Sequence, residues 1–248
     1  MMKGFLDLPY RLPFARHYAE FDRGFYVDFP VQLRLMGRWL RQHGCRRTLD
    51  IGAMTGGCIE YITGLGIRMD GIQFTEDVRR LAAARLRKAG VASTLFVSPV
   101  HAPLRLPGGA RYDGAVSLGW LNLPFPRSGL LATLRRIRRL LVPGGVFLFD
   151  FFGFKDLVVD RPDARLLPDG TALLSHAERR GGTLRRTHVW IPRGGGPRVE
   201  TSELVDRSAG EAEGLLREAG LEVVRRKRLE LNYPREFWAA RRPTSSAR

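Results

Sequence analysis

The chain has 248 residues, 44% of them apolar, so it is long enough to bury one sizeable hydrophobic core. Its two cysteines, Cys45 and Cys58, fit neither a disulfide framework nor a zinc ligand set, and they suit a reducing compartment. The net charge of +16 invites a nucleic-acid partner, but the basic clusters are scattered and lack interleaved aromatic residues, which favours solvated faces instead.

The sequence shows no signature of secretion or membrane insertion. Its first residues carry one lysine and no continuous apolar stretch before Pro9, which is not the pattern of a signal peptide. The longest apolar runs, such as 146–152, are far too short to span a bilayer. We therefore expect a soluble, cytoplasmic protein.

Residues 1–44 are predicted to form an N-terminal helical cap. The segment up to Pro30 is rich in aromatic residues and is broken by prolines. A helical pattern follows over 31–42, with its apolar side chains on one face.

From Thr48 to Phe151 the chain alternates short apolar strands with helices, which favours a parallel sheet covered by helices on both faces. The last helix of this region is predicted to stop at Pro143-Gly144-Gly145. The expected strands are 48–52, 68–73, near 93–97, 113–118 and 146–151, and the expected helices are 56–64, 76–89 and 130–141.

Beyond Gly153 the pattern changes to strands joined by glycine-rich turns, which predicts an antiparallel insertion. A helix and a final pair of strands then complete the domain, and the tail 243–248 is expected to be disordered. The expected insertion strands are 171–177, 184–191 and 198–206, the helix is 208–219, and the closing strands are 221–229 and 235–241.

The segment 48–61, TLDIGAMTGGCIEY, carries the main functional signal. A short strand ends in Gly52, a glycine-rich turn follows, and a helix begins near Gly57. Such a strand–loop–helix is where a mononucleotide-type ligand meets a sheet. Asp50, Gly52 and Gly56 fall on the first motif of class I S-adenosylmethionine (SAM) dependent methyltransferases, acidic-x-Gly-x-Gly-x-Gly, which the chain resembles; Met54 replaces the middle glycine. The run LLVPGGVFLFDFFG is a further hallmark of that family.

This resemblance implies an α/β fold with a Rossmann-like seven-stranded methyltransferase sheet, helices on both faces, an N-terminal helical cap and an antiparallel β insertion after the fifth strand. We expect one domain over 1–242. Its parts are the cap (1–44), the cofactor-binding core (45–153), the insertion (154–206) and the C-terminal helix and strands (207–242).

The resemblance also implies SAM as cofactor and S-adenosylhomocysteine (SAH) as product. Gly52 and Gly56 would allow close approach of the backbone, while Asp50 would hold the methionine end or else cap the helix. Gln73 stands where an acidic residue usually accepts the ribose hydroxyls, and Val100 where one usually reaches adenine, with His101 beside it. The expected cofactor set is Tyr18, Asp50, Gly52, Ala53, Gly56, Gln73, Phe74, Val100, His101 and Ser117.

The acceptor side is assigned by the same resemblance. Trp120 and Asn122 follow the fourth strand and would line the channel to the acceptor; the alternative is an aromatic side chain under the next helix and an asparagine turn. No Asn/Asp-Pro-Pro-aromatic element occurs there, which counts against a base-modifying enzyme. The insertion would cover the substrate through His176 and His188, and Tyr18, Asp22 and Tyr26 would fold over the ligand or pack on the domain edge.

A hydroxyl acceptor needs a general base, whereas an amine acceptor needs only its neutral form. The candidate catalytic residues are His17, Tyr18, His101 and Asp150, with His176 and His188 as further bases, and no metal site is expected.

The leading hypothesis is a SAM-dependent methyltransferase that acts on a small molecule, in specialised metabolism. Three altered anchors, at Met54, Gln73 and Val100, motivate the alternative of a repurposed fold with weak or lost SAM binding, either a cyclase or pericyclase or a non-catalytic binder. A third hypothesis, suggested by the charge, is an RNA methyltransferase. The expected partner is a small-molecule acceptor, and a homodimer is the candidate assembly.

Overall fold

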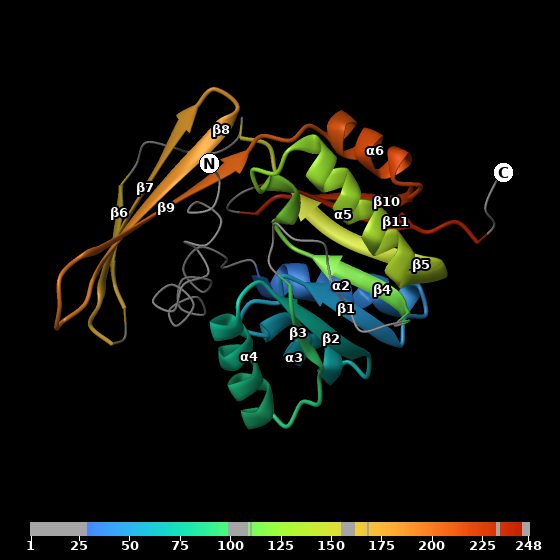
Figure 1. Cartoon of the computed structure of the whole chain (residues 1–248), viewed down its shortest axis with the longest axis horizontal. Helices are drawn as coiled ribbons and strands as arrows, with labels where there is room; N and C mark the ends of the chain where they lie inside the picture. The colour runs from blue at the N-terminus through green and yellow to red at the C-terminus, as the bar shows by residue number, and fades with distance from the viewer. Residues whose placement is uncertain are drawn as a thin grey trace.

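The computed structural model describes residues 29–98, 109, 111–154, 162–167, 169–231 and 234–244. Within these ranges the chain forms a seven-stranded sheet with helices and a separate four-stranded sheet (Figure 1). The first part of the predicted cap, with His17, Tyr18, Asp22 and Tyr26, lies outside the described residues, as do Val100, His101 and the end of the tail. No helix in the described ranges is long and apolar enough to cross a membrane.

The seven-stranded sheet has the strand order β10-β11-β5-β4-β1-β2-β3. The five strands β1 to β5 are parallel, and β11 runs antiparallel to both of its neighbours. Because the order reverses between β1 and β4, their carboxyl ends flank the crevice where such sheets bind ligands. The strands are β1 (Arg47–Ile51), β2 (Arg68–Gln73), β3 (Leu95–Val97), β4 (Tyr112–Ser117), β5 (Leu141–Phe151), β10 (Glu222–Leu229) and β11 (Arg235–Arg241).

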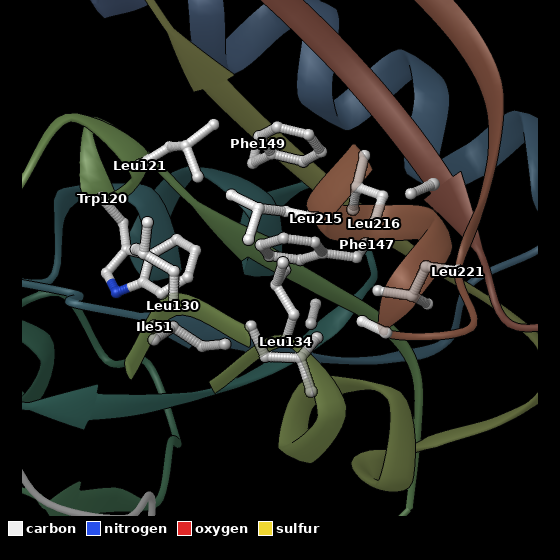
Figure 2. Close-up of a cluster of buried hydrophobic side chains, with 14 of the residues drawn as sticks. Ile51, Trp120, Leu121, Leu130, Leu134, Phe147, Phe149, Leu215, Leu216 and Leu221 are labelled. Atoms are coloured by element: carbon white, nitrogen blue, oxygen red, sulfur yellow. The ribbon is translucent and has the colours of Figure 1, made fainter. Parts of the chain in front are cut away.

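Helices cover both faces of this sheet, as predicted. On one face α5 (Arg127–Leu140) and α6 (Ala209–Glu218) pack over Phe147 and Phe149 of β5 (Figure 2). On the other face α2 (Phe29–Gln42) and α3 (Gly57–Gly64) pack over Leu148, and Leu86 of α4 (Glu76–Lys88) joins them. Successive β5 side chains therefore enter opposite cores, as the two-residue period of a strand requires.

The helix starts follow capping chemistry that is visible in the sequence. The Thr75 side chain accepts a hydrogen bond from Val78 N at the start of α4, and that of Ser208 accepts one from Glu211 N at the start of α6. The largest boundary error is at β5, which begins at Leu141, five residues before the predicted start, so Pro143-Gly144-Gly145 lies within the strand. Gly144 has φ +82°, and a Cβ on Gly145 would lie 2.9 Å from Val142 O, so both glycines are needed for this kinked entry.

The insertion forms the four-stranded antiparallel sheet β6-β7-β8-β9, which stands beside the main sheet in Figure 1. The sequence predicts three of its strands and misses the first, because that strand has only four residues, DARL, and two of them are charged. The strands are β6 (Asp163–Leu166), β7 (Ala172–Arg180), β8 (Thr183–Ile191) and β9 (Arg198–Val205).

Candidate functional site

The loop between β1 and α3 has the backbone conformation that its glycines predict. Gly52 and Gly56 have φ values of +82° and +81°, which favour glycine. The amides of Gly52 and Ala53 both donate to Ile72 O at 3.0 Å, so β2 fixes the loop beside Gln73. A Cβ on Gly52 would lie 3.0 Å from the Phe74 ring, and one on Gly56 would lie 3.3 Å from Leu86. Packing against the protein thus adds a second reason for glycine at both positions.

Met54, between those glycines, is the one non-glycine residue with positive φ, 41°, in the described part of the chain. This left-handed conformation costs an L-residue roughly 1–2 kcal/mol. Its side chain is half-buried and packs against Leu167, Leu173 and Trp190 of the insertion. The methionine side chain that replaces the motif's glycine therefore points toward the insertion and does not cover the loop.

Asp50, at the end of β1, is buried next to the loop. Burial raises the pKa of its carboxyl to about 7, while a hydrogen bond with Cys58 favours the ionised form. Cys58 is buried as well, and its burial together with the nearby Asp50 carboxylate raises the pKa of its thiol well above the usual range. The Asp50 carboxyl therefore ionises less readily than an exposed one, and a bound cation would favour its charged form.

Gln73 ends β2 and is fully buried. In the described structure neither its Oε1 nor its Nε2 has a hydrogen-bond partner. A buried amide without partners costs about 1–3 kcal/mol, so such groups are usually satisfied in native proteins. This amide lies at the end of β2 beside the loop, in the position where the family resemblance implies a ribose contact.

Ser117, Trp120 and Asn122, which the sequence assigns to the site, make structural contacts. The Ser117 Oγ donates to Ile51 O at 2.9 Å and joins the ends of β4 and β1. Trp120, in the short helix η2 (Trp120–Asn122), is buried in the core against Leu130 of α5 (Figure 2). Its position agrees with the alternative of an aromatic side chain beneath the following helix.

Asn122 joins the main sheet to the insertion. Its Nδ2 donates to Phe152 O at 2.9 Å and to Val205 O at 3.0 Å, and its Oδ1 accepts from Phe152 N at 3.1 Å. The side-chain amide is thus occupied by backbone at the end of β5 and at the end of β9. We assign it to the connection between the two sheets.

Asp150, a candidate base, is engaged in a buried ion pair. Its Oδ2 accepts from Arg235 Nη1 at 2.5 Å and its Oδ1 accepts from Gly119 N at 2.5 Å. Both groups of the pair are almost fully buried. The sequence analysis missed Arg235, although a basic residue that opens an apolar strand was a signal that it had a buried partner.

The two insertion histidines lie on opposite faces of their sheet, because Ser175 pairs with His188 while His176 pairs with Thr187. His176 is exposed. His188 is buried, and its Nδ1 lies 2.9 Å from Ser175 Oγ. Burial, with a contribution from Arg186, lowers the pKa of His188 to about 3. Only His188 faces inward, and it is neutral at physiological pH.

No group of histidine, cysteine or carboxylate side chains in the described ranges could hold a metal ion. Among the predicted cofactor residues that are described, Asp50, Gly52, Ala53, Gly56, Gln73 and Phe74 gather at the carboxyl ends of β1 and β2. The candidates His17, Tyr18, Tyr26, Val100 and His101 lie outside the described residues.

Several SAM-dependent methyltransferases are among the solved structures that resemble this one. One from Clostridium acetobutylicum is 13% identical, with a TM-score of 0.79, and the match covers 94% of this chain and 100% of that chain. The sugar N-methyltransferase KedS8 from Streptoalloteichus is 20% identical, with a TM-score of 0.75 and coverages of 91% and 92%. The SAM-bound amino pentose methyltransferase CalS10 from Micromonospora echinaspora, involved in calicheamicin biosynthesis, is 19% identical, with a TM-score of 0.73 and coverages of 91% and 96%.

No protein-family model matches the chain, and no curated protein sequence matches it. At these low identities the structural likeness establishes the fold. The chain has the fold of the SAM-dependent methyltransferases, with the seven-stranded sheet and the antiparallel insertion that its sequence predicts.

Proposed function

We propose that this protein is a SAM-dependent methyltransferase that acts on a small molecule. The observation that carries the proposal is the buried Gln73 amide at the edge of the glycine-rich loop, which has no hydrogen-bond partner among the described residues. A ribose diol supplies both a donor and an acceptor for such an amide. In this fold the end of the second strand is where the resemblance predicts that contact.

The other residues of the loop suit the rest of the same ligand. SAM would supply an electrophilic methyl group on a sulfonium and a methionine end with an ammonium group. The Asp50 carboxyl would face that cationic end, and its raised pKa means that binding also shifts its protonation. The backbone of Gly52 and Gly56 would approach the ligand without side chains between them.

The acceptor is proposed to lie under the inner face of the insertion, which carries His188 and Ser175. Asp150 is held by Arg235, and the lowered pKa of His188 makes its imidazole a weak proton acceptor, so neither of these described residues is placed as a strong base. An amine acceptor in its neutral form needs no such base. Two of the structural neighbours act on an amino pentose or a sugar nitrogen, which also supports an amine acceptor in this chain.

A titration tests the cofactor assignment. We expect SAH to bind the wild-type protein and Gly56→Arg to lose this binding by at least about 100-fold, because an arginine side chain has no room against Leu86 and would displace the loop that is proposed to hold the ligand. Gly44→Arg is the matched control: Gly44 has φ +66° and lies outside the site, in open space. Equal SAH affinity in both variants would contradict the proposal.

The repurposed fold remains the second candidate, and Met54 and Gln73 are the departures that favour it. It predicts weak or no SAH binding by a folded wild-type protein, and no methyl transfer. The RNA methyltransferase hypothesis receives less support, since arginines of β10 are already engaged. The Arg225 guanidinium lies 4.8 Å from the Trp39 ring centre, and Arg226 pairs with Glu213 at 2.7 Å. Steep salt-dependent RNA binding would favour it nonetheless.

For the assembly we propose a homodimer through the outer face of the insertion. Four of the six large hydrophobic side chains that are exposed in the described residues lie there: Leu166, Leu174, Ile191 and Val199. Leu174, Val189 and Val199 form one cross-strand row, so the apolar surface is continuous. Identical apolar patches can pair about a two-fold axis. Leu174→Glu should give a monomer by sedimentation, and an unchanged mass would contradict the dimer.

A further inference from the structure

The insertion contacts the rest of the described chain through two apolar clusters on its inner face. The proximal cluster (Phe152, Phe154, Leu184 and Leu204) lies where the chain enters and leaves the insertion. The distal cluster (Leu167, Leu173, Trp190 and Met54) lies near the turn between β6 and β7. On β8 the two clusters are six residues apart, from Leu184 to Trp190, which is about 20 Å of extended strand.

The proximal end is held by hydrogen bonds as well as by packing. Asn122 reaches Val205 O, the Asp206 carboxylate accepts from Phe154 N, and Arg179 donates to Phe154 O. The distal cluster contains one described residue from outside the insertion, and that residue is Met54. Its partner Trp190 is oriented by a hydrogen bond from its Nε1 to Glu200 at 3.0 Å.

The backbone of Met54 is set by the glycine-rich loop. Its φ of 41° lies between two glycines that are also left-handed, so the loop conformation determines where the thioether points. A rearrangement of the loop would withdraw the side chain from Leu173 and Trp190. Conversely, an insertion that opened at this end would leave Met54 in a strained conformation without its contacts.

We propose that Met54 is a positioning residue that couples the cofactor loop to the distal end of the insertion. The proposal rests on the proposed function, since the loop is taken to bind SAM. A ligand that stabilises the backbone of Gly52–Gly56 then also holds the insertion closed over the acceptor. Because coupling between two sites is reciprocal, the distal cluster in turn supports ligand affinity.

Hydrogen exchange of the insertion, with and without SAH, tests the coupling. In the wild type we expect SAH to slow exchange over 188–191 and 198–200 by at least about fivefold, the lower end of typical coupling. Met54→Gly should abolish this protection and raise exchange there without ligand. Met54→Leu, which keeps the volume, should behave as the wild type. Equal protection in Met54→Gly would overturn the proposal.

The reciprocal arm measures SAH affinity in two matched insertion variants. Leu173→Ala removes a distal contact and should weaken SAH binding about fivefold, whereas Leu184→Ala removes an equal volume from the proximal cluster and should leave it unchanged. Equal effects would overturn the coupling. If SAH binds none of the proteins, the cofactor assignment fails. Hydrogen exchange without ligand, compared between Met54→Gly and Met54→Leu, then tests whether the Met54 side chain holds the distal end of the insertion. Equal exchange in the two variants would show that it does not.

Discussion

The seven-stranded sheet and the four-stranded insertion use the same alternation of side chains but are covered differently. In β5, Phe147 and Leu148 enter opposite faces and both are fully buried, because helices lie on each side. In β7, Leu173 is buried on the inner face while its neighbour Leu174 is 43% exposed. The main sheet can therefore hold a site rigidly, whereas the insertion depends on the contacts at its two ends and on whatever covers its outer face.

The largest expected difference between the two regions is in core truncation. Phe147→Ala should lower the free energy of unfolding by about 3–5 kcal/mol, because it leaves a cavity between α5, α6 and the sheet. Leu173→Ala should raise exchange in the insertion and leave the main urea transition nearly unchanged. An equal shift of the urea midpoint in both variants would show that the two sheets unfold as one unit.

Breaking an ion pair should also cost more stability in the main sheet than in the insertion. Arg235→Met leaves the Asp150 charge buried and unpaired, and should cost about 3–5 kcal/mol of stability. Arg180→Met removes the pair with Glu178 on the insertion, where the arginine side chain is 61% exposed, and should cost under about 1 kcal/mol. Urea unfolding of both variants measures this. Similar losses of stability in the two variants would contradict this difference between the sheets. The double variant Arg235→Met, Asp150→Asn should recover much of the stability that Arg235→Met loses.

The pH dependence of ligand affinity should come from the main sheet. If the ammonium group of SAH needs ionised Asp50, whose pKa is about 7, SAH should bind about tenfold more tightly at pH 8 than at pH 6. For the stability of the free protein the pH dependence runs the other way. The raised pKa of Asp50 adds to the free energy of unfolding at low pH, and this contribution is lost as pH rises through about 7. Titrations of Asp50→Asn should show a flat profile, and an unchanged slope would remove Asp50 from the site.

The smallest effects are local. Thr75→Ala removes the cap of α4 and should cost about 1 kcal/mol. Thr183→Ala, at the start of β8 beside an exposed turn, should change stability by less than about 0.5 kcal/mol. Thermal unfolding of the two variants compares them, and a larger loss for Thr183→Ala would mean that this turn is held more firmly than its exposure indicates.

The main sheet could be predicted from the sequence because each of its signals is local. The apolar runs of the parallel strands and the glycines at 52 and 56 all act within a few residues. The boundary at Leu141 was wrong because the strand starts through a pairing with Tyr112, which local pattern does not contain. In the insertion β6 was missed because its four residues gain their structure from pairing with β7.

The site could be predicted only in part, for a similar reason. Asp50 and Gln73 were assigned to the site through the resemblance to the methyltransferase motifs, and the structure places them at the ends of β1 and β2. The ion pair of Asp150 with Arg235 joins residues 85 positions apart, and the role of Asn122 depends on Val205, 83 positions away. Met54 was recognised as a departure from a motif, but its contact with Trp190 depends on the folded insertion.

The most direct test of the cofactor site is calorimetric titration of SAH into the wild type and Gln73→Leu. Gln42→Leu is the control, since Gln42 lies on the exposed end of α2 and pairs with Arg225. We predict that the wild type and Gln42→Leu bind SAH equally, and that Gln73→Leu binds at least about tenfold more weakly because the ribose loses a hydrogen-bonded partner. Equal binding by all three proteins, or by none, would contradict the assignment of Gln73 as a cofactor residue.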